Sequence, residues 1–366
     1  MQNQQQPVNA VQLDANMRIQ QSGDNHFNWY SPLEKPFHIA GFGWLYEEKL
    51  YRRLPTKPDW KLSEAVDQLA NCTAGGQIRF ETYATSLSVK VKLTGTANMY
   101  HMTATGQCGF DCYIGGPGEQ LYYGTTVYDH TLSEYEAVFF KDMARESRII
   151  TLNFPLYQGV EEVWIGLDRE AQIAPPPAYE NSGKIIVYGT SITQGGCAAR
   201  PGMAYTNILS RRINREFLNL GFSGNGKGEP ELAQILSNIS DPACLILDYE
   251  ANCVSTELLQ RTLPEFIQIY RDKHPLTPIL VMSITYAKEK FHDQMAQDRA
   301  NRKQVQLRTV EQRRELGDAN IYFYDGSNLL GEDAHECTVD GVHPTDLGFL
   351  RMANGLTPVL QKILTN

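Results

Sequence analysis

The chain lacks any apolar run close to the roughly 20 residues that a membrane-spanning helix needs. It also lacks an excess of basic residues, because 33 lysines and arginines stand against 42 aspartates and glutamates, for a net charge of −9. An acidic protein is repelled by phosphate backbones and anionic lipid surfaces, which argues against nucleic acid and membranes as partners. The first seven residues contain neither the basic nor the apolar region of a secretory signal. A cytoplasmic protein and a mature exported form are both compatible with this.

Cysteine is also scarce, with seven residues in a chain of 366, too few for a disulfide framework. Cys197, Cys253 and Cys337 lie within a few residues of the motifs described below. A zinc site made from these thiols and a histidine is conceivable, but no Cys-x-x-Cys pair supports it. We therefore expect ordinary buried thiols, or one disulfide that braces the site.

The first half of the chain has the pattern of β structure. Residues 78–85 and 87–93 alternate apolar with polar side chains at period two, which is typical of half-buried strands, and similar runs continue to residue 167. Several short strands at this spacing predict a β-sandwich of jelly-roll-like form over residues 31–170. Residues 1–30 are polar and predicted to form an arm, whereas the consecutive prolines of 171–183 predict a stiff linker.

The second half, residues 184–366, alternates strand patterns with helix patterns. The predicted strands are 184–189, 217–221, 243–248, 278–284 and 320–325, and the predicted helices lie near 203–215, 229–239, 256–272, 294–317 and 346–363. This alternation predicts an α/β domain with a flavodoxin-like, doubly wound parallel sheet. The helix near 294–317 is so rich in charge that we expect it to present a solvated face.

A serine follows the first of these strands. Ser191 stands on a turn directly after the apolar run 185–188, with small neighbours that let a substrate approach. The turn should lie at the carboxyl edge of the parallel sheet, where open α/β sheets bind ligands. Serine is also common in turns for purely structural reasons, so Ser191 alone does not indicate catalysis.

A second motif about 150 residues downstream changes that interpretation. Asp340 and His343 are three residues apart on a glycine-containing turn, followed by Pro344. The short spacing lets the carboxylate reach one imidazole nitrogen while the other nitrogen faces outward. A serine nucleophile requires this combination of a base and a group that orients it. We therefore predict a triad with Ser191 as nucleophile, His343 as base and Asp340 as orienting acid.

These motifs resemble the conserved blocks of the SGNH, or GDSL-type, hydrolase superfamily. The four matching segments are 189–193, 219–224, 248–253 and 340–343. Thr190 replaces the aspartate that usually precedes the serine, and the third segment lacks its usual Gly-x-Asn-Asp form.

The resemblance implies an oxyanion hole as well as the triad. Its donors would be the backbone amides of Ser191 and Gly224 and the side chain of Asn252. Near these motifs, Arg200 and Asn225 are candidate substrate-binding residues, although Arg200 could equally form a structural ion pair and Asn225 could be an ordinary loop residue. His101, His274, His292 and His335 have no partner pattern, and we expect them to be surface or structural residues.

The first half carries a resemblance of its own. Gly109-Phe-Asp-Cys-Tyr113 is similar to the Gly-x-Asp-Leu-Tyr motif of an N-terminal domain that accompanies some SGNH esterases, with Cys112 in place of leucine. The two-domain order resembles that of bacterial polysaccharide-degrading esterases, which implies a periplasmic or secreted enzyme. Aromatic residues of this half could form a sugar-binding platform or fill the core of the sandwich.

Together, the motifs predict a serine esterase that needs neither a metal nor an organic cofactor. The expected substrate is a small-molecule or polysaccharide ester, with acetyl groups on carbohydrate favoured by the resemblance. Arylesterase, lysophospholipase or thioesterase activity would use the same residues, and a glycan-binding protein with an inactive hydrolase domain is the alternative of another class. The oligomeric state and the pairing of the cysteines stay open.

Overall fold

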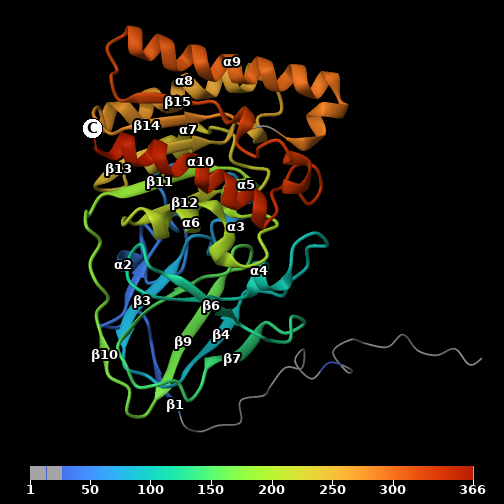
Figure 1. Cartoon of the computed structure of the whole chain (residues 1–366). Coiled ribbons are helices and arrows are strands. Elements are labelled where there is room, and N and C mark those ends of the chain that lie inside the picture. Colours follow the sequence, from blue (N-terminus) through green and yellow to red (C-terminus); the bar gives the residue numbers. More distant parts are fainter. Residues whose placement is uncertain (1–13, 15–26, 285, 366) are drawn as a thin grey trace, which may run out of the picture.

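The first half of the chain forms two facing antiparallel sheets in the computed structural model, which describes residue 14 and residues 27–284 and 286–365. One sheet has the strand order β1-β9-β4-β7, and the other has the order β10-β3-β8-β5-β6, with β2 paired to β3. Their bounds are β1 Phe27–Tyr30, β2 His38–Ala40, β3 Gln77–Thr82, β4 Leu87–Leu93, β5 Asp111–Ile114, β6 Leu121–Thr125, β7 Glu134–Phe140, β8 Arg148–Asn153, β9 Val160–Asp168 and β10 Ile173–Ala174. Figure 1 shows these strands in the lower part of the molecule.

The period-two pattern explains why the sheets face each other. In β4, Val89 and Val91 point into a shared apolar core, whereas Lys90 lies on the outer face. Phe80 of β3 and Leu152 of β8 enter the same core from the opposite sheet. The predicted β-sandwich is thus confirmed.

Two expected connecting segments take part in these sheets. Phe27–Tyr30, the end of the predicted arm, forms β1 and pairs with β9. Ile173 and Ala174 of the predicted linker form β10 and pair with β3. These two short segments, Phe-Asn-Trp-Tyr and Ile-Ala, are locally apolar, so they pair along the free edges of β9 and β3 although the sequence around them is polar or proline-rich. The rest of the predicted arm, 1–13 and 15–26, lies outside the described residues.

The second half forms a five-stranded parallel sheet with the order β12-β11-β13-β14-β15. Its strands are β11 Lys184–Gly189, β12 Phe217–Gly221, β13 Pro242–Asp248, β14 Ile279–Met282 and β15 Ile321–Tyr324. The helices between and after them are α5 Ser191–Gln194, α6 Tyr205–Arg212, α7 Pro230–Leu236, α8 Thr256–Lys273, α9 Asp293–Glu315 and α10 Asp346–Thr365. The doubly wound, flavodoxin-like prediction is confirmed.

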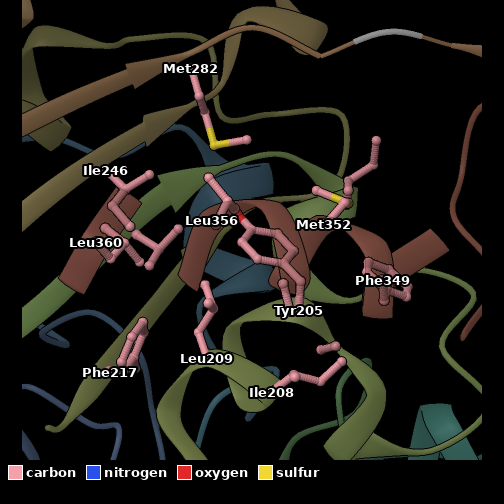
Figure 2. Packing of buried hydrophobic residues seen from close by; sticks show 14 of the residues in the cluster. Tyr205, Ile208, Leu209, Phe217, Ile246, Met282, Phe349, Met352, Leu356 and Leu360 are labelled. Atoms are coloured by element: carbon pink, nitrogen blue, oxygen red, sulfur yellow. The ribbon is translucent and has the colours of Figure 1, made fainter. Parts of the chain in front are cut away.

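Each face of the parallel sheet has its own apolar core. On one face, Leu209 of α6 and Leu356 of α10 pack with Ile246 of β13, as Figure 2 shows from close by. On the other face, α7, α8 and α9 cover the sheet, with Phe266 of α8 and Val310 of α9 fully buried. Strands buried on both faces explain the continuous apolar runs that the sequence shows.

The cores of the α/β sheet include residues from the first half of the chain. Leu54 and Val66 belong to the apolar cluster under α7 and α8, and Val66 lies on the short helix α3 (Glu64–Leu69). Met102 and Leu156 belong to the cluster under α6 and α10. The two halves therefore share buried apolar surface.

Among the described residues, we find no helix with the length and apolar character that crossing a membrane requires.

Candidate active site

Ser191 lies at the carboxyl edge of the parallel sheet. Strand β11 ends at Gly189, and Ser191 is the first residue of the one-turn helix α5 rather than a residue of an open turn. Thr190 caps this helix, because its hydroxyl accepts a hydrogen bond from the Ile192 amide at 3.2 Å. The Thr193 hydroxyl accepts in turn from the Thr190 amide. This short strand-to-helix connection holds Ser191 in one position, with 9% of its surface exposed.

A chain of hydrogen bonds joins the three residues predicted to form a triad. Ser191 Oγ lies 2.8 Å from His343 Nε2, and His343 Nδ1 lies 2.7 Å from Asp340 Oδ2. Asp340 Oδ1 accepts the backbone amides of Val342 and His343 at 3.0 and 2.8 Å. Because three groups hold the carboxylate, its orientation toward the imidazole is well defined.

The same contacts keep Asp340 ionised. Partial burial raises the pKa of Asp340, but the hydrogen bonds from the His343 ring and from the His343 and Val342 amides outweigh it and lower the pKa to about 2. Asp340 is therefore an anion that accepts from Nδ1, which places the free lone pair of a neutral His343 on Nε2. That nitrogen is the one beside Ser191.

The loop that carries His343 is far from Ser191 in the sequence but is held close to it in the fold. It follows the short helix η6 (Ala334–Cys337) and precedes α10, and a β-bridge joins Thr338 to Pro344. The last helix packs against α6, which starts soon after α5, so the loop returns to the edge where β11 ends. This packing brings His343 to a serine 152 residues earlier in the chain.

The residues predicted to form the oxyanion hole lie on two neighbouring loops. Gly224 follows β12 with φ = +67°, a left-handed conformation that favours glycine. Within the described residues its amide has no hydrogen-bond partner. Asn252 ends the short helix η3 (Glu250–Asn252) after β13, and its Nδ2 donates to the carbonyl of Phe222 at 3.1 Å. The Asn252 side chain is thus attached to the loop that carries Gly224.

A buried arginine holds the end of β12, just before the loop that carries Gly224. Arg53, from the first half of the chain, is 1% exposed and donates to the carbonyls of Asn219 and Gly221 at the end of β12. Its guanidinium also lies 4.9 Å from the Phe222 ring. No sequence motif pointed to Arg53, because a lone arginine outside the motifs carries no local signal.

The loop with Asn252 is held by arginines of α9. Glu250 is buried and accepts hydrogen bonds from Arg299 at 2.6 Å and from Arg302 at 2.8 Å. The expected solvated face of α9 is therefore only part of its surface, because Arg299, Gln306, Thr309 and Val310 are buried. The positive charges of Arg299 and Arg302 can lie at these poorly exposed positions because the negative charge of Glu250 offsets them.

Asp248, from the third matching segment, is buried beneath α5. Its carboxylate accepts hydrogen bonds from Tyr205 at 2.7 Å and from Thr193 at 2.8 Å. Burial raises the pKa of Asp248 to about 6, although these hydrogen bonds oppose the rise. Through Thr193 the aspartate supports the helix that starts at Ser191.

The two candidate substrate-binding residues already have protein partners. Arg200 Nη1 lies 3.0 Å from Asp111 and 2.6 Å from the Tyr113 hydroxyl, both in the Gly109–Tyr113 motif. Asp111 also accepts the Gly202 amide at 2.7 Å. The structural ion pair considered for Arg200 is thus present, and it joins the two halves of the chain. Asn225 donates to the Ser223 carbonyl in its own loop at 2.8 Å.

The sequence interpretation missed one residue beside the triad. His101 lies on the loop between β4 and α4 (Ala104–Cys108), and its ring centroid is 5.6 Å from that of His343, edge to face. Tyr100, with 93% of its surface exposed, stacks on His101 at 4.5 Å. The hydroxyl of Tyr157 donates to the Ser191 carbonyl at 3.2 Å. Residues of the first half therefore lie beside Ser191 and His343. No local sequence motif predicted this proximity.

All seven cysteines are free thiols, six of them buried. Of the outcomes we expected, the structure shows ordinary thiols rather than a disulfide. Cys197 lies beside the triad, where burial and, to a smaller extent, the charge of Asp340 raise its pKa to about 12. A thiol of this kind is neutral at ordinary pH and does not compete with Ser191 as a nucleophile.

Comparisons with known proteins cover both halves. Residues 182–361 match the GDSL-like lipase/acylhydrolase family, and residues 27–173 match the N-terminus of SGNH hydrolase-type esterases. A crystal structure of a GDSL-like lipase from Bacteroides ovatus is 32% identical with a TM-score of 0.85, covering 93% of this chain and 98% of that one. Among the curated proteins, none matches.

More distant structures share the fold. A salicylyl-acyltransferase from a tetracycline biosynthetic pathway is 18% identical with a TM-score of 0.74, covering 93% of this chain and 98% of its own. An acetyl xylan esterase from the rumen bacterium Butyrivibrio proteoclasticus is 11% identical with a TM-score of 0.58, covering 93% and 99%. At sequence identities this low, the comparison shows that these proteins share a fold with this chain and nothing about its activity.

Proposed function

Because this chain belongs to the GDSL-like lipase/acylhydrolase family and is an ester hydrolase, we propose that it is a serine esterase that removes short acyl groups, chiefly acetyl, from carbohydrate esters. The observation that carries the proposal is the unbroken hydrogen-bond chain from Ser191 through His343 to Asp340. It lies at the sheet edge where this class of fold binds ligands.

In the proposed reaction, Ser191 Oγ attacks the ester carbonyl while His343 Nε2 takes its proton. Asp340 stabilises the imidazolium that forms and keeps the ring in the required tautomer. His343 then gives the proton to the leaving alkoxide, which departs as an alcohol and leaves an acyl-serine. Water activated by the same imidazole hydrolyses this intermediate and restores the free serine.

The developing oxyanion would be bound by the amides of Ser191 and Gly224 and by Asn252. The Asn252 amide has two N–H groups, and the one that donates to Phe222 orients the other. Removing one such donor from a hydrolase typically costs about 3–4 kcal/mol of transition-state stabilisation. The left-handed backbone of Gly224 supports this role, because it leaves the glycine amide without an intramolecular partner.

The side chains of the first half that lie beside the triad favour a short acyl group on a sugar. Tyr157 donates to the Ser191 carbonyl, and the His101 ring lies 5.6 Å from that of His343, so we infer that the acyl site is narrow on this side. The exposed face of Tyr100 offers an apolar surface on which a sugar ring can stack. A family two carbohydrate esterase from Cellvibrio japonicus and the acetyl xylan esterase each share the fold over 93% of this chain. Export to the periplasm or the medium, in a bacterial setting, is part of the proposal because polymeric substrates are found there.

The test compares p-nitrophenyl acetate, butyrate and octanoate with acetylated xylan, for the wild type, Ser191→Ala and the exposed-loop control Ser240→Ala. We expect the acetate to be hydrolysed fastest, acetate to be released from xylan, and Ser191→Ala to retain less than about one-thousandth of kcat. A preference for octanoate would replace the proposal with a lysophospholipase or thioesterase. Full activity of Ser191→Ala would refute the nucleophile.

A further inference from the structure

A second set of ligating atoms converges on His343. One ring nitrogen of His101, the sulfur of Cys197 and one ring nitrogen of His343 all lie within 4.8 Å of one another. In a tetrahedral zinc site, bonds of about 2.0–2.3 Å place the ligand atoms roughly 3.5 Å apart. Shifts of about 1 Å in the side chains would therefore close the cluster around one ion. Two imidazoles and a thiolate are ligands that zinc commonly uses.

His343 is already prepared as a metal ligand. Its Nδ1 donates to Asp340, so Nε2 is the nitrogen with a free lone pair. Zinc-binding histidines typically have this same carboxylate partner on the opposite ring nitrogen, which orients the ring and increases its basicity. The negative charge of Asp340 also offsets part of the charge of a divalent cation.

His101 and Cys197 have features that the proposed ester hydrolysis does not use. His101 Nδ1 is buried and has no hydrogen-bond partner among the described residues, which is unusual for a buried polar atom. Cys197 is 7% exposed and has φ = +73°, a conformation uncommon outside glycine. Such strained conformations cluster at functional sites. In this conformation the thiol lies beside the two histidines.

We propose that His101, Cys197 and His343 form a binding site for a thiophilic divalent cation such as Zn²⁺, and that its occupation reversibly inhibits the enzyme. Binding converts the Cys197 thiol to a thiolate and releases its proton to water. The ion takes the lone pair of His343 Nε2, so the hydrogen bond with Ser191 is lost and the imidazole can no longer accept the serine proton. The inhibition, though not the binding, rests on the proposed function of His343.

Direct binding tests the site without reference to activity. Chelator-treated protein is titrated with Zn²⁺ against a chromophoric chelator, and with Co²⁺, whose bond to a thiolate gives a near-ultraviolet charge-transfer band. We expect one equivalent to bind, with the cobalt band absent in Cys197→Ser and zinc affinity reduced about tenfold or more in Cys197→Ser and His101→Phe. Cys72→Ser, which changes a half-buried thiol outside the cluster, should bind like the wild type. Unchanged binding in both cluster variants would overturn the proposal.

A second arm separates this inference from the esterase proposal. Ser191→Ala should bind Zn²⁺ as the wild type does, even though it hydrolyses no ester. Zinc should inhibit the wild type and Cys72→Ser, and EDTA should restore activity, with inhibition expressed relative to each variant's activity in chelator. Zinc binding by a protein that lacks esterase activity would refute the proposed function and leave the site standing. An active esterase that zinc neither binds nor inhibits would refute the site alone.

Discussion

Replacing Asp340 with asparagine tests the tautomer argument with little change of shape. Asparagine can still accept the Val342 and His343 amides through its carbonyl oxygen, in place of Asp340 Oδ1. Its NH₂ group then faces His343 Nδ1, from which the carboxylate of the wild type accepts a hydrogen bond at 2.7 Å. Two donors cannot share this contact, so the ring proton moves to Nε2. In that tautomer His343 donates to Ser191 and cannot act as its base.

The expected loss follows from this inversion. In serine hydrolases the wrong imidazole tautomer lowers kcat by roughly 10³- to 10⁴-fold. At about 1.36 kcal/mol per factor of ten, this corresponds to about 4–5 kcal/mol of transition-state stabilisation. KM should change little, because neither Asp340 nor Nδ1 faces the substrate. Stability should also change little, because the side chain is 27% exposed and the backbone contacts persist.

Steady-state hydrolysis of p-nitrophenyl acetate gives kcat and KM, and circular dichroism checks the fold. Asp333→Asn is the matched control, because Asp333 pairs with Arg351 close to the same loop and is half exposed. We expect the control to keep kcat within about a factor of two. If folded Asp340→Asn kept more than a tenth of the wild-type kcat, Asp340 would not set the tautomer and the reasoning would fail.

Three further predictions concern stability. Asp111→Ala should lower the free energy of unfolding by about 2–4 kcal/mol in denaturant titrations, because it leaves the largely buried Arg200 unpaired, whereas Asp59→Ala, at an exposed position, should not. Burial raises the pKa of Asp248 to about 6 in the folded state, above its value in the unfolded chain. The free energy of unfolding of the wild type, relative to that of Asp248→Asn, should therefore be highest below about pH 4 and fall by on the order of 3 kcal/mol as the pH rises to 7. A difference that does not change with pH would contradict the burial argument. Residues 183–366 expressed alone should aggregate or bind hydrophobic dyes, because their cores lose side chains from the first half; a soluble monomer that unfolds cooperatively would contradict this.

Local patterns were enough to predict most of the α/β half. The strands over 184–189 and 217–221 match β11 and β12, and the strand order is that of the predicted flavodoxin-like layout. Both signals are local, since periodicity reports which face of an element is buried. The same topology predicted that the loops after β11, β12 and β13 meet at one edge. The structure places Ser191, His343 and Asp340 in contact there, while their catalytic roles stay proposals.

Only the tertiary structure decided which residues of the first half reach that edge. His101 stands on a loop without a motif, yet packing of the two halves places it against His343. Arg200 and Arg299 are indistinguishable in sequence from surface arginines, but each is held by an acidic partner far along the chain. Such pairings depend on how two folded halves dock and on which charges are desolvated together. Neither the docking of the halves nor the joint burial of charges produces a periodic pattern in the sequence. The sequence alone therefore determined the helices, the strands and the candidate triad, whereas tertiary packing determined which residues surround the triad.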